Sequence, residues 1–589
     1  MSKIKNQDYN ISGIFKNFYV VPDYQREYVW EEKHVMQLLE DILDGFNNER
    51  NSEYFIGSIV VCENDGMFQV IDGQQRLTTL FLALASIKKH LNSFDENTSD
   101  IDNMLFSKTR NKNGKQVDAF RLELQYEHCH DILDKITRGN SADDYNFKSK
   151  SERNIVEAFN TVDDFLSNNF KELEETQDFL GYFLNNVKMI QIETPKISDA
   201  LKIFETINER GVGLNPMDLL KNLIFRNVEP EQFTKLKEKW KNITDLIENN
   251  DEKTLRFLRY FIMANYDVKK PNGEEIIRED EIYDWITKNE SQCSYESDPF
   301  GFVDFLHANA NAYVNYVKGR DNSGEQNIYL GNIKKLGKSF RQHHMLLLAA
   351  KDLNTKHFNY LAKQIEILSF YYILTKQSTT IYEVKFSKWA KEIRQISTEF
   401  DLNRFIENSI MRDVSEKEVE FKNAFLNISL RTHQKYKIKY VLAKLTQYID
   451  QQRLGDFEEQ NLDTYITKGV EVEHILPLTP SDMLEQSFGV NYEEYKNKLG
   501  NLTLLEKPMN IVAGRNYFSE KKPIYNNSRF YLTKSIAHID PVGNNSSINR
   551  TNQLLKSFEF WDEKTINERQ GILFDIAQRV WRVESLKTT

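Results

Sequence analysis

The pattern of apolar positions near the start of the chain predicts a strand pair followed by a helix. Residues 54–61 form an apolar run with the length of a buried strand, residues 64–66 (Asn-Asp-Gly) carry a hairpin-turn signal, and residues 68–71 are suited to the returning strand. A helix is expected next, because one apolar stripe follows the 3.6-residue helical period. The stripe consists of Leu77, Leu80, Phe81, Leu84 and Ile87. Asp72-Gly73 therefore lies at a strand-to-helix junction.

Helical periodicity dominates the middle of the chain. Two capped helices are expected to meet within residues 198–226, the first ending at Gly211 and the second beginning at Pro216. Residues 230–412 then follow helical spacing with polar interruptions. One interruption, residues 318–328, is expected to be a flexible hinge in a segment that transmits a signal along the chain.

The composition favours a folded, mainly helical protein with several domains. Of 589 residues, 40% are apolar and 12% aromatic, which excludes a disordered chain. The 23 glycines and 11 prolines are roughly half the usual share, too few for an all-β protein with many tight turns. From residue 415 helical spacing continues to about 450 and changes to short strands at about 470–505. We therefore predict an α+β, predominantly helical fold. The predicted domains are residues 1–228, 229–414 and 415–589.

The sequence favours a protein that remains in the cytoplasm. Its longest apolar runs reach only about a third of the ~18 residues that a membrane span requires. The first ten residues (MSKIKNQDYN) lack the apolar core of a secretory signal. The three cysteines are odd in number and far apart, which fits reduced thiols and gives no zinc-ligand spacing. We therefore expect no membrane association and no structural zinc.

The net charge of −11 is distributed unevenly. Residues 421–589 carry 23 Lys and Arg against 20 Asp and Glu, which leaves a net charge of −14 on residues 1–420. Within the basic third, residues 507–534 contain six basic residues and one acidic residue. This run is a candidate phosphate-contacting surface, with a merely solvated face as the alternative. The basic residues assigned to it include Lys507, Arg515, Lys521, Lys522 and Arg529.

The segment Asp72-Gly73-Gln74-Gln75-Arg76 has the chemistry of a phosphate or nucleotide cradle. Gly73 lets backbone N–H groups approach an anion, the helix dipole favours negative charge there, and Arg76 adds a forked donor. The amides of Gln74 and Gln75 both donate and accept, as contacts to a base or ribose require. A structural alternative makes Asp72 a helix cap and Arg76 a surface ion pair. The chain has no P-loop motif, so the site is not of Walker type.

This segment resembles the N-terminal half of GmrSD-type restriction proteins. The resemblance rests on Asp72–Leu80 (DGQQRLTTL), Tyr24-Gln25-Arg26, Trp30, Gly57-Ser58, Phe204, Asn208, Arg210-Gly211 and Asp218–Lys221. It implies a ParB/sulfiredoxin-like domain that hydrolyses an NTP with a divalent cation and, in SspE-like relatives, helps to sense modified DNA. The resemblance assigns nucleotide binding to Asp72, Gly73, Gln74, Gln75 and Arg76. It places Tyr24, Gln25 and Arg26 nearby in a sensing role.

A second group of residues has the spacing of an HNH, or ββα-metal, nuclease. Glu473-His474 is followed by Pro477, and Asn501 and Asn510 lie 27 and 36 residues after the histidine. Phosphodiester hydrolysis needs a base to activate water and a cation to stabilise charge on the departing oxygen. The resemblance to the HNH fold implies that His474 is the general base and that Asn501 fixes the loop behind it. Glu473 and Asn510 would ligate one hard cation, Mg²⁺ or Mn²⁺ rather than zinc.

The C-terminal residues extend the same resemblance. Phe518, Lys521, Trp561, Arg569 and Trp581 are similar to the nuclease domain of the GmrSD family. We therefore predict a divalent-metal-dependent DNA endonuclease that is regulated by an NTP and acts against phage by cutting modified foreign DNA. The basic run of residues 507–534 is expected to contact the DNA. A homodimer is an open option. Two alternatives remain open. One is a non-cleaving NTP-dependent DNA-binding regulator with a vestigial HNH domain, and the other is an RNA-cutting toxin.

Overall fold

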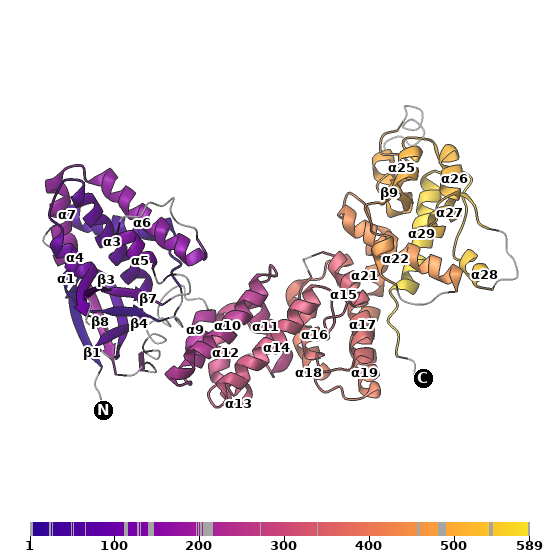
Figure 1. Ribbon diagram of the computed structural model, residues 1–589. Coiled ribbons are helices and arrows are strands. Elements are labelled where there is room, and N and C mark those ends of the chain that lie inside the picture. Colours follow the sequence, from indigo (N-terminus) through magenta and orange to yellow (C-terminus); the bar gives the residue numbers. More distant parts are fainter. Residues whose placement is uncertain are drawn as a thin grey trace. The chain divides into compact units, whose positions relative to one another are not determined.

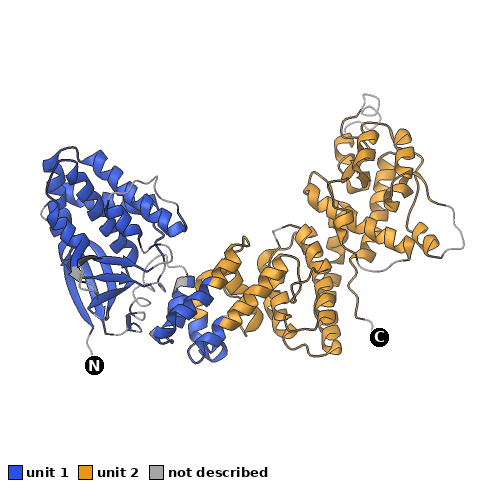
Figure 2. Cartoon of the chain, in the orientation of Figure 1, with its two compact units in different colours: residues 1–241, 286–303 blue, residues 242–285, 304–589 orange. Residues whose placement is uncertain are grey.

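The chain forms two compact units (Figure 2) in a computed structural model. Unit 1 comprises residues 1–241 and 286–303, and unit 2 comprises residues 242–285 and 304–589. Most of the segment predicted as a separate helical spacer therefore belongs to the same unit as the C-terminal region. The structure describes residues 4–586 except 23, 24, 26, 49, 51, 65, 111–115, 126–128, 130, 139–146, 196, 198, 201, 202, 204–215, 271, 272, 338, 339, 456–459, 481–490 and 541–545.

Unit 1 contains a six-stranded mixed sheet (Figure 1) with the strand order β1-β8-β3-β4-β2-β7. These strands are β1 Lys5–Asn10, β2 Tyr19–Val21, β3 Tyr54–Asn64, β4 Met67–Asp72, β7 Leu122–Leu124 and β8 Val187–Thr194. β3 pairs antiparallel with β4, as the predicted hairpin requires, and parallel with β8. A separate two-stranded sheet is formed by β5 Phe106–Arg110 and β6 Gln116–Phe120.

The helix predicted after the hairpin is α3, Gln74–Asn92, which packs against α6, Lys150–Asn169. All five residues of its predicted apolar stripe are at most 1% exposed, so the predicted strand-strand-helix segment is confirmed. The predicted end of a capped helix at Gly211 lies outside the described residues. Before residue 230 the described part of the chain also contains α1 Ile11–Ile14, α2 Glu32–Asn48, α4 Ser99–Leu105, α5 Ile132–Thr137, α7 Leu173–Asn185 and α9 Pro216–Phe225.

Unit 2 is mainly helical and carries one two-stranded sheet in its described part. Its strands, β9 Val470–His474 and β10 Leu502–Glu506, confirm the strand pattern predicted near 470–505. The predicted class, α+β and predominantly helical, is confirmed as well. Within the described residues, no helix is both long enough and apolar enough for a membrane span.

The remaining helices belong to the middle and the C-terminal region. In the middle they are α10 Phe233–Glu248, α11 Thr254–Asn265, α12 Ile282–Lys288, α13 Glu290–Cys293, α14 Pro299–Val317, α15 Ile328–Lys335, α16 His343–Ala349, α17 Thr355–Leu374, α18 Thr379–Ile393, α19 Glu399–Phe405 and α20 Arg412–Glu416. Toward the C-terminus they are α21 Glu418–Leu426, α22 Lys435–Leu454, α24 Tyr492–Tyr495, α25 Lys507–Ala513, α26 Phe518–Asn526, α27 Tyr531–Ala537, α28 Ser546–Asn552 and α29 Glu563–Val580.

Residues 318–328, expected to be a flexible hinge, form a hydrogen-bonded turn. The N–H of Gly319 donates to the carbonyl of Tyr316 at 2.9 Å. The carboxylate of Asp321 accepts from the N–H groups of Ser323 and Glu325 at 2.9 and 3.1 Å. These hydrogen bonds close a turn within the segment, and its role as a flexible hinge stays a prediction.

Two adjacent buried histidines predict a loss of stability in acid. His343 and His344 are 4% and 3% exposed, and burial lowers the pKa of His344 to about 3 and that of His343 well below its usual value. Below pH 6.5 the unfolded chain binds protons that the folded chain does not, so stability falls as the pH drops from 6.5. At pH 5 the unprotonated His344 alone should cost about 2 kcal/mol of unfolding free energy, and His343 acts in the same direction.

Urea unfolding of the full-length protein at pH 7 and pH 5 measures this effect. The variant His344→Gln should lose less stability between the two pH values than the natural protein. The matched control is His538→Gln, which changes an exposed histidine and should leave the pH dependence as it was. A natural protein equally stable at both pH values would contradict the prediction.

Candidate functional site

The residues predicted to perform hydrolysis gather around the small sheet of unit 2. β9 ends at His474, which lies opposite Leu502 at the start of β10 in the antiparallel register. α25 begins directly after β10 and packs against both strands. This strand-strand-helix order brings Asn510, in the middle of α25, toward the strand that carries His474.

His474 has a ring nitrogen with no internal partner. Its Nε2 atom is buried and makes no hydrogen bond with any described residue. Burial, followed by the positive charges of Lys521, Lys435 and Lys496, lowers the pKa of His474 to about 4. The imidazole is therefore neutral at pH 7, and one ring nitrogen is able to accept a proton.

Asn510 contributes a second unpaired polar atom. Its Oδ1 is buried and has no hydrogen-bond partner in the described part of the chain. Most buried polar atoms in proteins are paired, because an unpaired one costs free energy. An orphaned amide oxygen on a helix that packs against β9 is a suitable oxygen ligand for a hard cation.

Asn501 ties together the loop that follows His474. It is fully buried, and its Oδ1 accepts from the N–H of Leu476 at 2.7 Å and from the indole N–H of Trp561 at 2.8 Å. Its Nδ2 donates to the carbonyls of Leu476 and Lys496 at 3.0 and 2.9 Å. The side chain of Asn501 thus fixes the backbone that follows His474. Its polar atoms are used within the chain and do not face a substrate.

Residues of helix α29 hold the main chain on both sides of Asn501. Arg569, 3% exposed, donates to the carbonyls of Gly500 and Leu502 at 2.7 and 2.8 Å. Gln570 accepts a hydrogen bond from the N–H of Gly500. A Cβ atom on Gly500 would lie 2.2 Å from the carbonyl oxygen of Ile566, so this close approach requires glycine. Gln570 carried no signal in the sequence, because its partner lies 70 residues away.

The carboxylate of Glu473 faces α26. Its Oε1 accepts from the ammonium of Lys521 at 2.7 Å and from the hydroxyl of Tyr525 at 2.8 Å. Burial raises the pKa of Glu473, and Lys521 opposes that change. Because the side chain of Lys521 is 0% exposed, its predicted role as a DNA contact is wrong. Its positive charge instead pairs with the Glu473 carboxylate inside the site.

The oxygen donors fit a hard divalent cation. Glu473 and Asn510 supply the type of ligand that Mg²⁺ prefers, and Mg²⁺ often uses only one or two protein carboxylates with water and phosphate oxygens completing its shell. The described residues contain no group of three or more His, Cys, Asp or Glu placed to hold a metal by themselves. The donor set therefore suits Mg²⁺ or Mn²⁺ better than structural zinc, which needs four nitrogen or sulfur ligands.

The other predicted DNA contacts differ in their exposure. Lys507 and Arg515 are exposed, at the two ends of the α25 segment. Lys522 and Arg529 donate to backbone carbonyls at 2.9 and 3.1 Å, so part of their hydrogen-bonding capacity is used within the chain. Lys507 and Arg515 are therefore the best placed of the predicted set to meet a phosphate.

Two further lysines lie close enough to act electrostatically on His474. Lys435 begins α22, and its side chain is 64% exposed, whereas that of Lys496 is 14% exposed. Both lower the pKa of His474, which places their charges near the imidazole. Sequence reasoning missed them because they lie outside the basic run of residues 507–534.

The N-terminal cradle contains a glycine in the left-handed backbone region. Gly73 begins α3 with a φ of 85°, in the left-handed region, and a Cβ there would lie 2.5 Å from a side-chain carbon of Ile59. The N–H of Gly73 donates to Asp72 Oδ1 at 2.7 Å. Burial raises the pKa of Asp72, and the charge of Arg76 opposes the change.

Arg76 is oriented by the strand beside it. Its Nη1 donates to the carbonyl of Ile56 at 2.9 Å. A Cβ on Gly57 would lie 1.8 Å from the same nitrogen, so glycine makes room for the guanidinium. Gln74, next to the helix start, is 8% exposed. The predicted cradle residues thus lie together where β3, β4 and α3 meet.

The side-chain amide of Gln75 is hydrogen-bonded to the backbone of residues 27–30. Its Oε1 accepts from the N–H groups of Val29 and Trp30 at 2.9 and 3.3 Å, and its Nε2 donates to the carbonyl of Glu27 at 3.0 Å. The amide therefore holds residues 27–30 against α3. This role supports the loop that precedes α2 and leaves the side chain less free to contact a base than the sequence suggested.

The predicted sensing residues are described only in part. Tyr24 and Arg26 lie outside the described residues. Gln25 is 5% exposed, and its Nε2 has no partner among the described residues. Thr78, in the first turns of α3, has a buried hydroxyl that is also unpaired there. Both polar groups belong to the part of unit 1 that carries the DGQQR segment.

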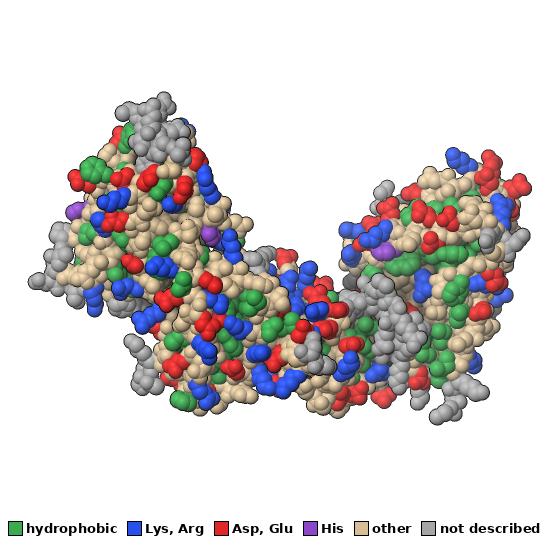
Figure 3. Space-filling view, turned by 180° about the vertical axis from the view of Figure 1, so that it is seen from behind, with side chains coloured by type: hydrophobic (Ala, Val, Ile, Leu, Met, Phe, Trp, Pro, Cys, Tyr) green, Lys and Arg blue, Asp and Glu red, His purple; other side chains and the backbone are tan. Residues whose placement is uncertain are grey.

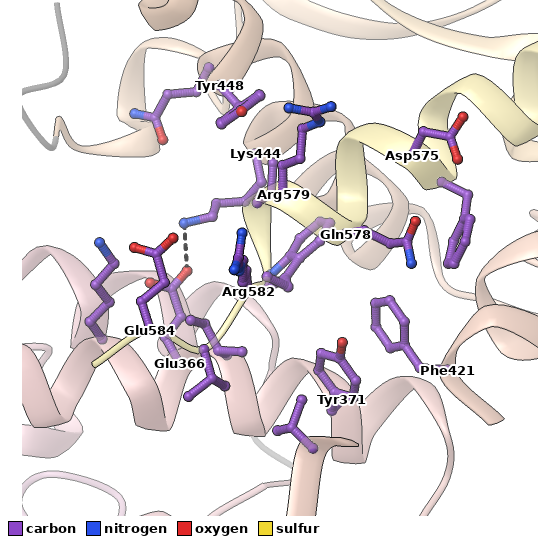
Figure 4. Close-up of a pocket in the computed structure, with 18 of the residues that line it drawn as sticks. Glu366, Tyr371, Phe421, Lys444, Tyr448, Asp575, Gln578, Arg579, Arg582 and Glu584 are labelled. Atoms are coloured by element: carbon purple, nitrogen blue, oxygen red, sulfur yellow. Dashed lines mark ion pairs between the residues drawn. The ribbon is translucent and has the colours of Figure 1, made fainter. Parts of the chain in front are cut away.

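A large cavity in unit 2 is lined by none of the predicted site residues. It has a volume of about 1440 Å³ and is lined by residues of α17, α22 and α29, among others. Figure 4 shows Lys444 directed toward Glu366, at 2.9 Å, while Arg579, Arg582, Asp575 and Glu584 also line it. Acidic and basic side chains are balanced there, so its charge favours no anionic ligand.

A neutral histidine, an orphaned asparagine oxygen and a buried carboxylate on a strand-strand-helix frame define a site suited to metal-assisted hydrolysis. Residues 5–225 match the N-terminal domain of GmrSD restriction endonucleases, and residues 415–576 match the C-terminal domain of the same family. The two matches together cover more than half of the chain. The chain belongs to the GmrSD restriction endonuclease family.

One relative is similar to part of the chain. An uncharacterized protein of Methanocaldococcus jannaschii is 27% identical over 278 residues. The alignment covers 41% of this chain and 44% of that relative, so the chain matches less than half of the relative's length. This similarity carries no information about activity.

Proposed function

We propose that the chain is an HNH-type endonuclease that uses a hard divalent cation to hydrolyse DNA in defence against phage. The observation that carries the proposal is a pair of buried atoms, His474 Nε2 and Asn510 Oδ1, which lie on elements that pack together and have no hydrogen-bond partner among the described residues. One is suited to accept a proton and the other to bind a cation. Family membership supports the same class of activity.

In the proposed reaction, neutral His474 takes a proton from the water that attacks the phosphate. Its lowered pKa keeps it neutral at pH 7, as a base requires. Asn501 holds the loop behind the histidine through four hydrogen bonds. Glu473 and Asn510 are the residues that would hold Mg²⁺ or Mn²⁺, which when bound stabilises negative charge on the departing oxygen.

Positive side chains around His474 would orient the DNA backbone. Lys435, Lys507 and Arg515 are exposed and are proposed to contact phosphates on either side of the scissile bond. On the face drawn in Figure 3, Lys and Arg side chains are interspersed with Asp and Glu. With the net charge of −14 on residues 1–420, this mixture favours selective rather than general binding to DNA.

The N-terminal unit is proposed to bind an NTP in a ParB/sulfiredoxin-like cradle and to regulate cleavage of modified DNA. Support comes from the left-handed Gly73 at the start of the 19-residue helix α3, where backbone N–H groups and the helix dipole favour a phosphate. Arg76 adds a charged donor at the same place, in a space that Gly57 leaves open.

Arg76→Ala is expected to weaken nucleotide binding about 10-fold or more, because one charge-assisted hydrogen bond is worth roughly 1.5 to 3 kcal/mol. Calorimetric titration of the full-length variant with each NTP and Mg²⁺ measures the effect. Arg121→Ala, which removes an arginine elsewhere in unit 1 that donates to Lys16 and Asn103 carbonyls, serves as the control. Unchanged affinity and turnover in Arg76→Ala would remove the cradle assignment.

A substrate panel tests the proposed function as a whole. Purified full-length protein is given Mg²⁺ or Mn²⁺, each NTP, and equal amounts of modified phage DNA, unmodified DNA and RNA. We expect cleavage of DNA, strongest for modified DNA with the preferred NTP. Cleavage of RNA alone would favour the toxin alternative. Binding of NTP and DNA with no cleavage under any condition would favour the regulator.

A further inference from the structure

We propose that Lys521 is a positioning residue of the nuclease site, which fixes the Glu473 carboxylate relative to the main chain of His474. The inference rests on the proposed nuclease function and deepens it. The ammonium of Lys521 donates to Glu473 Oε1 at 2.7 Å and to the backbone carbonyl of His474 at 2.7 Å. The ammonium group of Lys521 thus bridges two consecutive residues, Glu473 and His474, at the end of β9.

This bridge is closed to solvent. The side chain of Lys521 is 0% exposed and that of Glu473 is 6% exposed. Tyr525, four residues after Lys521 on the same face of α26, donates to the same carboxylate oxygen at 2.8 Å. Two donors from one helix therefore restrict the rotation of the Glu473 side chain.

Stability alone is a poor explanation for a buried ion pair of this kind. Removing two charges from water costs more than most such pairs return, and apolar replacements of similar volume are often as stable. This pair lies directly beside His474, and its lysine binds the histidine's own carbonyl group. The arrangement therefore serves the geometry of the site, in the way that outer partners orient the groups that bind a metal.

The test compares Lys521→Met with Lys556→Met in the full-length protein. Lys556 belongs to the same unit, lies outside the basic run of residues 507–534, and pairs with Glu568 instead of Glu473. We expect Lys521→Met to lower the kcat of plasmid nicking by roughly 10- to 100-fold with little change in KM, and to weaken Mn²⁺ binding in a calorimetric titration by a similar factor. Lys556→Met should match the natural protein in kcat and Mn²⁺ affinity.

A folded Lys521→Met variant with natural kcat and natural Mn²⁺ affinity would overturn the proposal. Tighter Mn²⁺ binding by this variant would also overturn it, because the lysine would then compete with the cation instead of positioning its ligand. If Lys521→Met does not fold, Tyr525→Phe keeps the ion pair and removes one donor to Glu473. We expect Tyr525→Phe to lower kcat about 10-fold, and an unchanged kcat and Mn²⁺ affinity would contradict the proposal.

This experiment separates the proposal from the function on which it rests. If the natural protein nicks no DNA with any divalent cation, the proposed nuclease function fails, and this is visible without any variant. If the natural protein nicks DNA and Lys521→Met nicks it equally well, only the role of Lys521 fails.

Discussion

Replacing His474 with alanine is expected to slow DNA cleavage by about 10²- to 10⁴-fold, because the attacking water then lacks its proposed general base. The fold should survive, since Nε2 of this histidine makes no hydrogen bond within the described chain. The melting temperature should therefore change little, and the proposed nucleotide binding by unit 1 should not be affected.

Initial rates of nicking on a supercoiled plasmid measure this effect. The control is His538→Ala, which removes an exposed histidine from the same unit and should cut at the natural rate. An undiminished rate in His474→Ala would exclude this histidine from the reaction.

Asn510→Ala is expected to lower the cleavage rate at 1 mM Mg²⁺ by at least about 100-fold, the upper end of the cost of losing a residue that only supports a metal ligand. The reason differs from that for His474. Asn510 would act through the cation, so part of the loss should be recovered at high Mn²⁺, which generally binds nitrogen and oxygen ligands at least as well as Mg²⁺.

The matched control for this variant is Asn516→Ala. Asn516 is exposed, lies six residues after Asn510, and donates to the carbonyl of Val512 at 3.3 Å. It should cleave at the natural rate with the natural metal dependence. A loss in Asn510→Ala that is identical at every Mn²⁺ concentration would argue that this residue acts on something other than the cation.

Local patterns in the sequence predicted the elements that carry both sites. The hairpin of β3 and β4 and the buried stripe of α3 follow from apolar spacing within about 35 residues, where each residue's neighbours along the chain decide its environment. The strands around His474 and Leu502 were predicted for the same reason. The order of the six-stranded sheet was not, because β8 inserts between β1 and β3 from more than 120 residues away.

The side chains whose surroundings differ from those expected share one physical cause. The basic run around Lys521 predicts an exposed DNA-contact surface. In the structure the ammonium of Lys521 is buried and pairs with Glu473, which lies 48 residues earlier in the chain. The amide of Gln75 was expected to contact a base, but the backbone of residues 27–30 occupies it. Charge and hydrogen-bonding capacity are visible in a sequence, whereas the partner that takes them up depends on the tertiary fold.

The most direct measurement of the central claim is nicking of a supercoiled plasmid by the full-length protein in Mg²⁺, in Mn²⁺ and in EDTA, with His474→Ala assayed beside it. The account predicts open-circular or linear product with either cation, none in EDTA, and at least about 100-fold less product from His474→Ala. Equal product in EDTA and Mg²⁺, or equal product from the natural protein and His474→Ala, would contradict it.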